Sequence, residues 1–256
     1  MKKALIVWPF ISLLAFMIMS SGFGHPAKKK LNKLAAVKGF ALVELFTSEG
    51  CSSCPPADDA VAALAKEYPS GVFVLSYHVD YWNYLGWKDP FSSADYSSRQ
   101  QQYAAVFDLN SIYTPQVIVN GKTQFTGSDK SRLYNVVDKA LNEKNTASIE
   151  LSAAATAAKE VQVNYKTNAD KNMLVRVALV QLQASNAIKR GENRGLQLKH
   201  IDVVRSFKTA GSNAGSISFT FPEGLTAKDC KVILFVQNAT NMHIAGAAEC
   251  PVNVVM

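Results

Sequence analysis

The chain contains 256 residues, of which 48% are hydrophobic and 18% are charged, and its formal net charge is +7. This composition excludes a wholly disordered chain, and the length is sufficient for two domains of roughly 100–150 residues each. Four cysteines are too few for a small protein held together by disulfides. Cys51 and Cys54 lie close together, whereas Cys230 and Cys250 lie far downstream, so we expect the two pairs to have different roles.

The N-terminus has the pattern of a secretory signal peptide. Two lysines precede an apolar stretch over residues 4–19, and small residues follow up to Gly24, where we expect cleavage. The stretch is shorter than the roughly 20 apolar residues that span a bilayer, and it contains Pro9; a membrane-anchoring helix is the alternative. Residues 25–35 are expected to form a polar leader with a solvated lysine run. No other stretch has the length and apolar character of a membrane span.

Charge and compartment limit the partners that we expect. Removing Lys2 and Lys3 from the 27 basic residues leaves 25 against 20 acidic residues, a net charge of +5. Basic residues do not alternate with aromatic residues along one face, so we expect no nucleic-acid partner. An exported protein works in the periplasm or outside the cell, where the oxidising environment allows disulfides to persist.

Residues 36–147 alternate between strand and helix patterns. Short apolar runs ended by turn residues predict buried strands, and apolar residues at helical spacing predict helices. Asn120-Gly121 is a strong hairpin signal. Together these elements predict an α/β domain. The expected strands are residues 40–46, 72–77, 116–119 and one starting at Phe125, and the expected helices are residues 58–68, 92–107 and 129–141.

Residues 148–256 have a different pattern. Apolar and polar residues alternate over 161–165 and 217–221, which predicts half-buried antiparallel strands. The continuously apolar runs 174–182 and 232–236 predict central strands. We therefore expect a second, all-β, sandwich-like domain, with a long irregular insertion over residues 184–215.

The most informative stretch is a Cys-x-x-Cys motif between the first strand and the first helix. Cys51 and Cys54 are followed by Pro55 and Pro56, which lack a backbone N–H and are tolerated in the first turn of a helix. A helix N-terminus carries a partial positive charge that stabilises a thiolate. We expect Cys51 to attack a substrate disulfide and Cys54 to resolve the mixed disulfide. The alternatives are an ordinary structural bridge and half of a zinc site.

A Thr114-Pro115 dipeptide precedes the third expected strand. With this dipeptide and the Cys-x-x-Cys motif, residues 36–145 resemble the thioredoxin superfamily. The resemblance implies a thioredoxin-like fold, a cis peptide bond before Pro115, and a substrate groove shaped by Thr114 and Pro115. It also implies that Glu44, in the first strand, is a buried acid that assists proton transfer from Cys54. An exposed edge carboxylate is the alternative for Glu44.

The second strand continues into a loop rich in aromatic residues. This loop contains Tyr81, Trp82 and Trp87, and it lies at the carboxyl end of a strand, where sites of α/β proteins are found. We expect these three side chains to contact a substrate. His78 is a candidate to tune a thiolate or accept a proton. Alternatively, His78 and Asp80 form a satisfied loop pair and the aromatic residues cover the core.

Several longer runs resemble an exported bacterial family known as domain of unknown function 1223. The resemblance covers nearly the whole mature chain and implies the fold, but it implies no established reaction. The runs are residues 44–58, 78–82, 85–91, 113–116 and 190–193.

The second cysteine pair predicts a structural brace. Residues 232–236 and 244–248 read as the arms of a hairpin that turns at Thr240. In that register Cys230 and Cys250 stand opposite each other, with Cβ atoms about 4.5–5.5 Å apart, close to what a disulfide needs. We expect a Cys230–Cys250 disulfide; two free buried thiols are the alternative.

These observations predict an exported thiol–disulfide oxidoreductase whose partners are protein or small-molecule thiols and disulfides. We expect no cofactor and no resident metal. One alternative is a non-catalytic module that binds a ligand or partner on a thioredoxin-like scaffold. Another is a chaperone for a soft metal such as copper(I), held by Cys51, Cys54 and His78.

Overall fold

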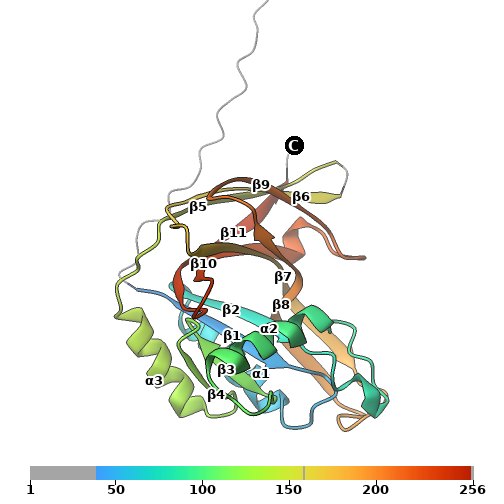
Figure 1. Ribbon diagram of the computed structural model, residues 1–256. Coiled ribbons are helices and arrows are strands. Elements are labelled where there is room, and N and C mark those ends of the chain that lie inside the picture. The colour runs from blue at the N-terminus through green and yellow to red at the C-terminus, as the bar shows by residue number, and fades with distance from the viewer. Residues whose placement is uncertain (1–38, 158, 255–256) are drawn as a thin grey trace, which may run out of the picture. The chain divides into compact units, whose positions relative to one another are not determined.

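The computed structural model describes residues 39–157 and 159–254 (Figure 1). The signal peptide and polar leader expected over residues 1–35 lie outside the described residues. Within the described ranges, no helix has the length and hydrophobicity needed to cross a membrane.

The described residues form an 11-stranded mixed sheet with the strand order β4-β3-β1-β2-β8-β7-β10-β11-β5-β6-β9. Three α-helices and two short 3-10 helices accompany it. The strands are β1 (Ala41–Thr47), β2 (Val72–His78), β3 (Gln116–Val119), β4 (Thr123–Thr126), β5 (Ile149–Ala155), β6 (Glu160–Thr167), β7 (Met173–Ala187), β8 (Gln197–Ala210), β9 (Ala214–Thr220), β10 (Cys230–Asn238) and β11 (Ile244–Val254). The helices are α1 (Pro55–Glu67), η1 (Asn83–Leu85), α2 (Ala94–Val106), α3 (Lys130–Leu141) and η2 (Ala227–Asp229).

The predicted fold class, an α/β thioredoxin-like domain followed by a separate all-β sandwich-like domain, is wrong. The expected strands and helices of residues 36–147 are present, but they do not form a sheet of their own. β2 pairs in parallel with β8 through Ser76 and Val203, so strands from both halves of the chain belong to one mixed sheet.

The error arose in residues 184–215, which were expected to be an irregular insertion. They contain the last four residues of β7 and all of β8, strands of 15 and 14 residues that remain paired as far as Ala187 and Gln197. The outer part of this hairpin is half exposed, and only isolated side chains such as Leu198 are buried there. Its sequence therefore lacks the regular alternation of apolar and polar residues by which a strand is recognised.

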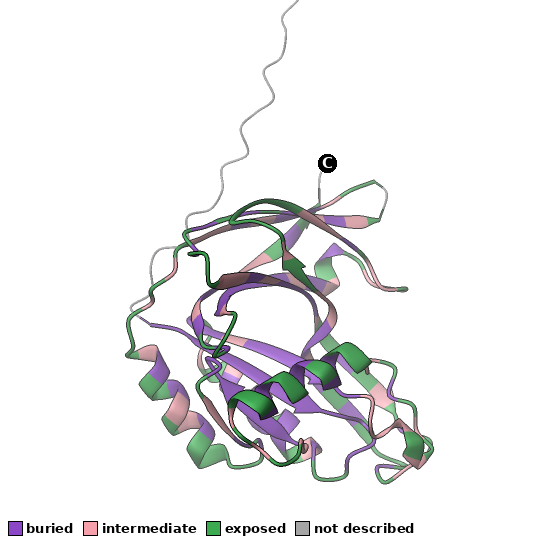
Figure 2. Cartoon of the chain, in the orientation of Figure 1, coloured by how far each residue is buried: buried purple, intermediate pink, exposed green. Residues whose placement is uncertain are grey.

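Three hydrophobic clusters hold the sheet together. β1 is buried along its whole length (Figure 2), and its side chains alternate between two of the clusters. Val43 and Leu45 pack in the cluster that includes α1 and α3, whereas Phe46 packs on the other side with Tyr103 of α2. The third cluster joins β5, β6 and β9 to β7 and β10, which lie beneath them in Figure 1.

The predicted Cys230–Cys250 disulfide is wrong, because both thiols are free. The hairpin turns half a residue beyond Thr240, and a β-bulge between Val236 and Gln237 shifts the register of β10 and β11 by one more residue, so that Val232 rather than Cys230 faces Cys250. Burial raises the pKa of the Cys230 thiol to about 11 and that of Cys250 to about 12. Both cysteines are therefore neutral, unreactive members of the third cluster.

Peptide mapping without reduction tests this register. When the protein is unfolded in the presence of an alkylating agent, we expect Cys230 and Cys250 to be recovered as separate alkylated peptides, because the bulge separates them in the folded state. The Cys51–Cys54 pair should remain linked in the same sample. A recovered Cys230–Cys250 link would contradict the register described above.

Candidate functional site

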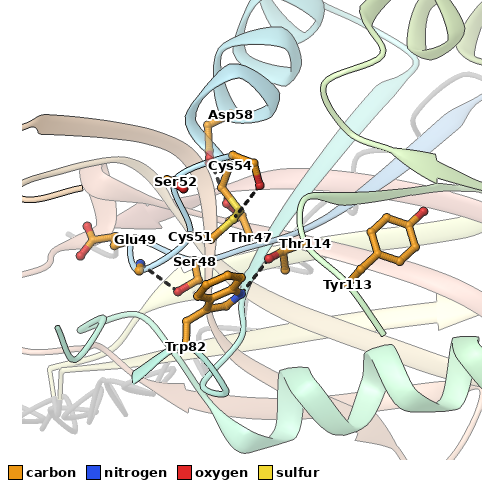
Figure 3. Close-up of a disulfide and its surroundings, with 12 residues drawn as sticks. Thr47, Ser48, Glu49, Cys51, Ser52, Cys54, Asp58, Trp82, Tyr113 and Thr114 are labelled. Atoms are coloured by element: carbon orange, nitrogen blue, oxygen red, sulfur yellow. Dashed lines mark hydrogen bonds between the residues drawn. A yellow bond between two sulfur atoms is a disulfide. The ribbon is translucent and has the colours of Figure 1, made fainter. Parts of the chain in front are cut away.

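The candidate site is built around the cysteine turn, residues 48–54, which joins β1 to α1 (Figure 3). Cys51 and Cys54 form a disulfide, with Cα atoms 5.5 Å apart. Cys54 is the N-cap of α1, and the two prolines that follow occupy the first helical positions, where no backbone N–H is required. The disulfide therefore lies at the positive end of the α1 dipole, as the sequence predicts.

Both cysteine side chains are covered. Cys51 is 0% exposed and Cys54 is 1% exposed, so accessibility does not distinguish the two side chains. Ser52 and Ser53 between them are exposed. The surface that a partner meets at this turn is therefore the Ser52-Ser53 dipeptide, with the sulfur atoms beneath it.

A buried carboxylate lies one helical turn after Cys54. Asp58 accepts a hydrogen bond from Thr47 Oγ1 at 2.9 Å, and its other oxygen lies 3.0 Å from His200 Nδ1. In Figure 3, Asp58 lies on one side of the disulfide, with Trp82 and Thr114 on the other. Because Asp58 follows Cys54 by four residues, both side chains are on the same face of α1.

His200 brings a positive charge into this buried region. It comes from β8, is 3% exposed, and its Nε2 lies 3.4 Å from Glu49 Oε1 without forming a hydrogen bond. Burial lowers the pKa of His200, but the hydrogen bond to Asp58 and the negative charges of Asp58 and Glu49 outweigh burial and raise it to about 10. His200 is therefore a protonated imidazolium at neutral pH.

A second imidazole packs against the first. His78 Nδ1 lies 2.7 Å from Asp89 Oδ2, and the rings of His78 and His200 have centroids 4.6 Å apart. The same Asp89 oxygen accepts a hydrogen bond from the Glu49 backbone N–H at 2.8 Å. Burial raises the pKa of Asp89, but the charge and hydrogen bond of His78 outweigh this effect and hold it below its usual range. His78 thus reaches the cysteine turn indirectly, through Asp89 and through the ring of His200.

The aromatic loop, residues 79–91, packs against the cysteine turn. Trp82 Nε1 donates to Thr114 Oγ1 at 2.8 Å, and Trp87 Nε1 donates to Glu49 Oε2 at 2.9 Å. Tyr81 points elsewhere, since its hydroxyl donates to Gln100. The structure therefore brings Trp82 and Trp87 to the site, while their role in binding a substrate stays a prediction.

The Thr114–Pro115 peptide bond is cis, which confirms the expectation from the resemblance. Thr114 contacts Trp82 beside the disulfide (Figure 3). The substrate groove expected at Thr114 and Pro115 remains a prediction.

Glu44 does not lie beside Cys51 and Cys54. It is buried, but its side chain lies in the core between the sheet and α2, where Arg99 donates to it at 2.6 and 2.9 Å and Tyr103 at 2.5 Å. α1 packs against the opposite face of β1, at Val43 and Leu45. Glu44 is therefore the anion of a buried ion pair, and Asp58 is the carboxylate that follows Cys54.

The loop between β7 and β8, residues 188–196, makes hydrogen bonds to the cysteine turn. Asn193 is buried, and its Nδ2 donates to the backbone oxygens of Glu49 at 2.9 Å and Cys51 at 3.0 Å. Glu192 accepts a hydrogen bond from the Ser52 backbone N–H at 3.0 Å. Three residues of the turn, Glu49, Cys51 and Ser52, are thus held by a loop about 140 residues downstream.

The two histidines and three carboxylates beneath the turn do not form a metal centre. Within residues 39–157 and 159–254, no group of three His, Cys, Asp or Glu side chains is placed to hold a metal ion. The carboxylates instead receive protein donors, as the contacts of Asp58, Asp89 and Glu49 show.

Part of this site was not predicted from the sequence. Residues 190–193 belong to a run that resembled the family, which was the only signal that this loop matters. Thr47, Asp58 and Asp89 have polar side chains near recognised motifs, but nothing in their spacing predicts a shared buried network. The residues that sequence reasoning missed are Thr47, Glu49, Asp58, Asp89, Asn186, Glu192, Asn193 and His200.

Replacing His200 with Gln should change how stability depends on pH. Folding raises the His200 pKa from 6.5 to about 10, so its stabilisation is complete below about pH 6.5 and is lost as the pH rises through 10. We expect the free energy of unfolding of the wild type, relative to His200→Gln, to fall between pH 7 and pH 9.5 in urea titrations. His243→Gln is the control, because His243 is exposed and its pKa is lowered. A constant difference for His200→Gln would contradict the assigned charge.

The fold and the site define a protein with one extended mixed sheet and a disulfide at the start of its first helix. The chain belongs to the family described as "Protein of unknown function (DUF1223)", whose model matches residues 42–237. This match confirms the resemblance seen in the sequence to that family.

The crystal structure of protein AGR_C_4864 from Agrobacterium tumefaciens is similar, with 32% sequence identity and a TM-score of 0.62. The match covers 87% of this chain and 98% of that one. A domain of the outer membrane lipoprotein Omp28 from Porphyromonas gingivalis matches at 12% identity over 43% of this chain and 91% of that one. Its TM-score of 0.29 is too low to support any conclusion. No curated protein matches the chain.

Proposed function

We propose that this protein is an exported thiol–disulfide oxidoreductase that uses Cys51 and Cys54 as its reactive pair. The observation that carries the proposal is the Cys51–Cys54 disulfide across the turn that starts α1. Closing so short a loop constrains the unfolded chain little, so a purely stabilising role explains the bridge poorly. Export is supported by the signal-like sequence before residue 24.

The exchange passes through a mixed disulfide on Cys51. In the direction that oxidises a substrate, a substrate thiolate attacks Cys51 Sγ, the Cys51–Cys54 bond breaks, and its electron pair leaves on Cys54 Sγ. A second substrate thiolate then attacks the substrate sulfur, and Cys51 leaves as a thiolate. Two electrons move from two substrate thiols to the cysteine pair. The reverse sequence reduces a substrate disulfide.

The leaving Cys54 thiolate needs a proton, and Asp58 with its partner His200 is the group best placed to supply one. Asp58 follows Cys54 by one helical turn and is tied to the protonated His200 at 3.0 Å. Thr47 fixes the other carboxylate oxygen. This role replaces the one that the resemblance implied for Glu44, whose carboxylate is occupied by Arg99.

A turnover assay tests the proposed function. The purified protein should accelerate reduction of insulin by dithiothreitol or the oxidative refolding of a reduced test protein. The Cys51→Ser variant should lose this acceleration, because it lacks the attacking thiol and cannot close the Cys51–Cys54 disulfide. Cys230→Ser is the matched control and should retain full activity, since the Cys230 thiol is free and buried. Equal rates with wild type and with Cys51→Ser would end the proposal.

A further inference from the structure

Exposed cations gather on the two loops that border the cysteine turn. Lys189, Arg190 and Arg194 are exposed on the β7–β8 loop, and Lys88 is exposed on the aromatic loop. Among the described residues, none of these four cations forms an ion pair. We refer to Lys88, Lys189, Arg190 and Arg194 as the basic rim.

Contacts fix the basic rim beside the disulfide. Asn193, which bonds to Cys51 O, is the direct neighbour of Arg194, so the two Cα atoms are about 3.8 Å apart. The loop also touches the aromatic loop at Gly191, where an added Cβ would lie 3.2 Å from Trp87 Cβ. Gly191 has a positive φ of 74°, so this close approach suits glycine. The two loops therefore contact each other, and both border the cysteine turn.

The acidic groups of the region do not cancel this charge. Glu192 is the one acid of the β7–β8 loop, and its carboxylate is held by the Ser52 N–H. The carboxylates beneath the turn are buried and have partners of their own: Asp58 meets His200, Asp89 meets His78, and Glu49 meets Trp87. The other acids near the turn are Asp80, which is partly exposed and accepts a hydrogen bond from Ser97, and Asp59, which is exposed on α1. The four exposed cations outnumber Glu192, Asp80 and Asp59, so the rim keeps a net positive charge.

We propose that the basic rim selects thiols and disulfides that carry carboxylates next to the reacting sulfur. This proposal rests on the proposed function and names its substrate class. A substrate sulfur that attacks Cys51 must approach over the exposed Ser52-Ser53 dipeptide, which the rim borders. Salt limits the reach of the rim charges to about one Debye length, roughly 8–10 Å at ordinary ionic strength. They raise the local concentration of an anionic reactant and stabilise its mixed disulfide with Cys51.

The test compares thiols of different charge with the purified, oxidised protein. The probes are glutathione, which is net negative, 2-mercaptoethanol, which is neutral, and cysteamine, which is positive. For each thiol, the rate constant for opening the Cys51–Cys54 disulfide is measured and expressed per thiolate. It is then divided by the rate constant with which the same thiol opens a small model disulfide. At low ionic strength we expect glutathione to be favoured over cysteamine by about tenfold, with mercaptoethanol between them, and this preference to vanish in 0.5 M salt.

Two multiple variants distinguish the effect of the basic rim on the thiol preference from the effect of the protein's overall charge. Lys88→Gln/Lys189→Gln/Arg190→Gln/Arg194→Gln, which neutralises the whole rim, should abolish the preference while the neutral thiol reacts at its wild-type rate. Lys166→Gln/Lys171→Gln/Lys228→Gln, which removes three exposed charges far along the sheet, should leave the preference intact. Cysteine peptides flanked by Asp or by Lys then show whether an acidic protein segment is favoured in the same way as glutathione.

The experiment distinguishes failure of the proposed substrate class from failure of the proposed oxidoreductase function. Equal corrected rates for the three thiols, or a preference that survives neutralisation of the rim, would overturn the substrate class and leave the oxidoreductase proposal standing. Failure of all three thiols to open the disulfide would overturn both.

Discussion

Replacing Cys54 with Ser will arrest the protein as a mixed disulfide. Cys51 can still react with a substrate disulfide, but without the Cys54 thiol nothing displaces the substrate from it. Incubation of the reduced variant with an oxidised test protein should convert most of it to a covalent adduct that reducing agent releases. The wild type should show almost none, because Cys54 resolves the adduct. Nonreducing gels and mass spectrometry of the Cys51 peptide provide the measurement.

Two matched variants control this experiment. Cys51→Ser retains Cys54 in its position as N-cap of α1, and it should form little adduct because Cys54 is not the attacking thiol. Cys51→Ser/Cys54→Ser should form none, since Cys230 is buried, Cys250 is partly buried, and the pKa values of both thiols are raised. Adducts carried by Cys54 would reverse the assignment of the two roles, and adducts in the double variant would place the reactive thiol elsewhere.

Replacing Glu44 with Ala will destabilise the fold severely. Arg99 would lose both hydrogen bonds from its guanidinium to Glu44, and it would remain buried among the rings of Tyr103, Phe207 and Phe235. An unpaired buried charge costs about 3–5 kcal/mol. Urea unfolding, or a low yield of folded protein, would reveal this loss. Glu44→Gln retains hydrogen-bonding atoms at the same place and should lose less, which keeps the comparison measurable if Glu44→Ala does not fold.

The exposed pair of Lys122 and Glu143 provides the control. Its atoms are as close as those of the buried pair, at 2.6 Å, but the side chains are 41% and 53% exposed. Surface ion pairs contribute about 0–1 kcal/mol, so Glu143→Ala should unfold almost like the wild type. A similarly small loss for Glu44→Ala would show that Glu44 and Arg99 do not form the buried pair described above.

Local features of the fold were predictable from the sequence, and its topology was not. The strand over 40–46, the helix after Cys54 and the hairpin at Asn120-Gly121 follow from short-range patterns, and all three are present. The pairing of β2 with β8 joins residues more than 120 positions apart through a single register pair, Ser76 and Val203. No periodicity in either strand specifies that neighbour, and the resemblance to thioredoxins favoured a sheet that ended before residue 147.

The candidate site also contains a part that was predictable from local motifs and a part that was not. The disulfide, the Thr114–Pro115 peptide and Trp82 were predictable because each lies in a motif whose chemistry is local. His200 was not, because its position beside Asp58 depends on the length of β8 and the pairing of that strand with β7. For Glu44 the prediction was wrong in the other direction. The acid was expected to assist the cysteines, but its partner is Arg99 on α2.

The reduction potential of the Cys51–Cys54 pair tests the central claim most directly. The folded protein would be equilibrated in glutathione and dithiothreitol buffers of graded potential, quenched with acid and alkylated, and the Cys51–Cys54 peptide quantified by mass spectrometry. We predict a reversible two-electron transition above about −300 mV, because structural disulfides of secreted proteins lie below that value. A pair that stays oxidised below −300 mV, or that is reduced only when the protein unfolds, would contradict the account.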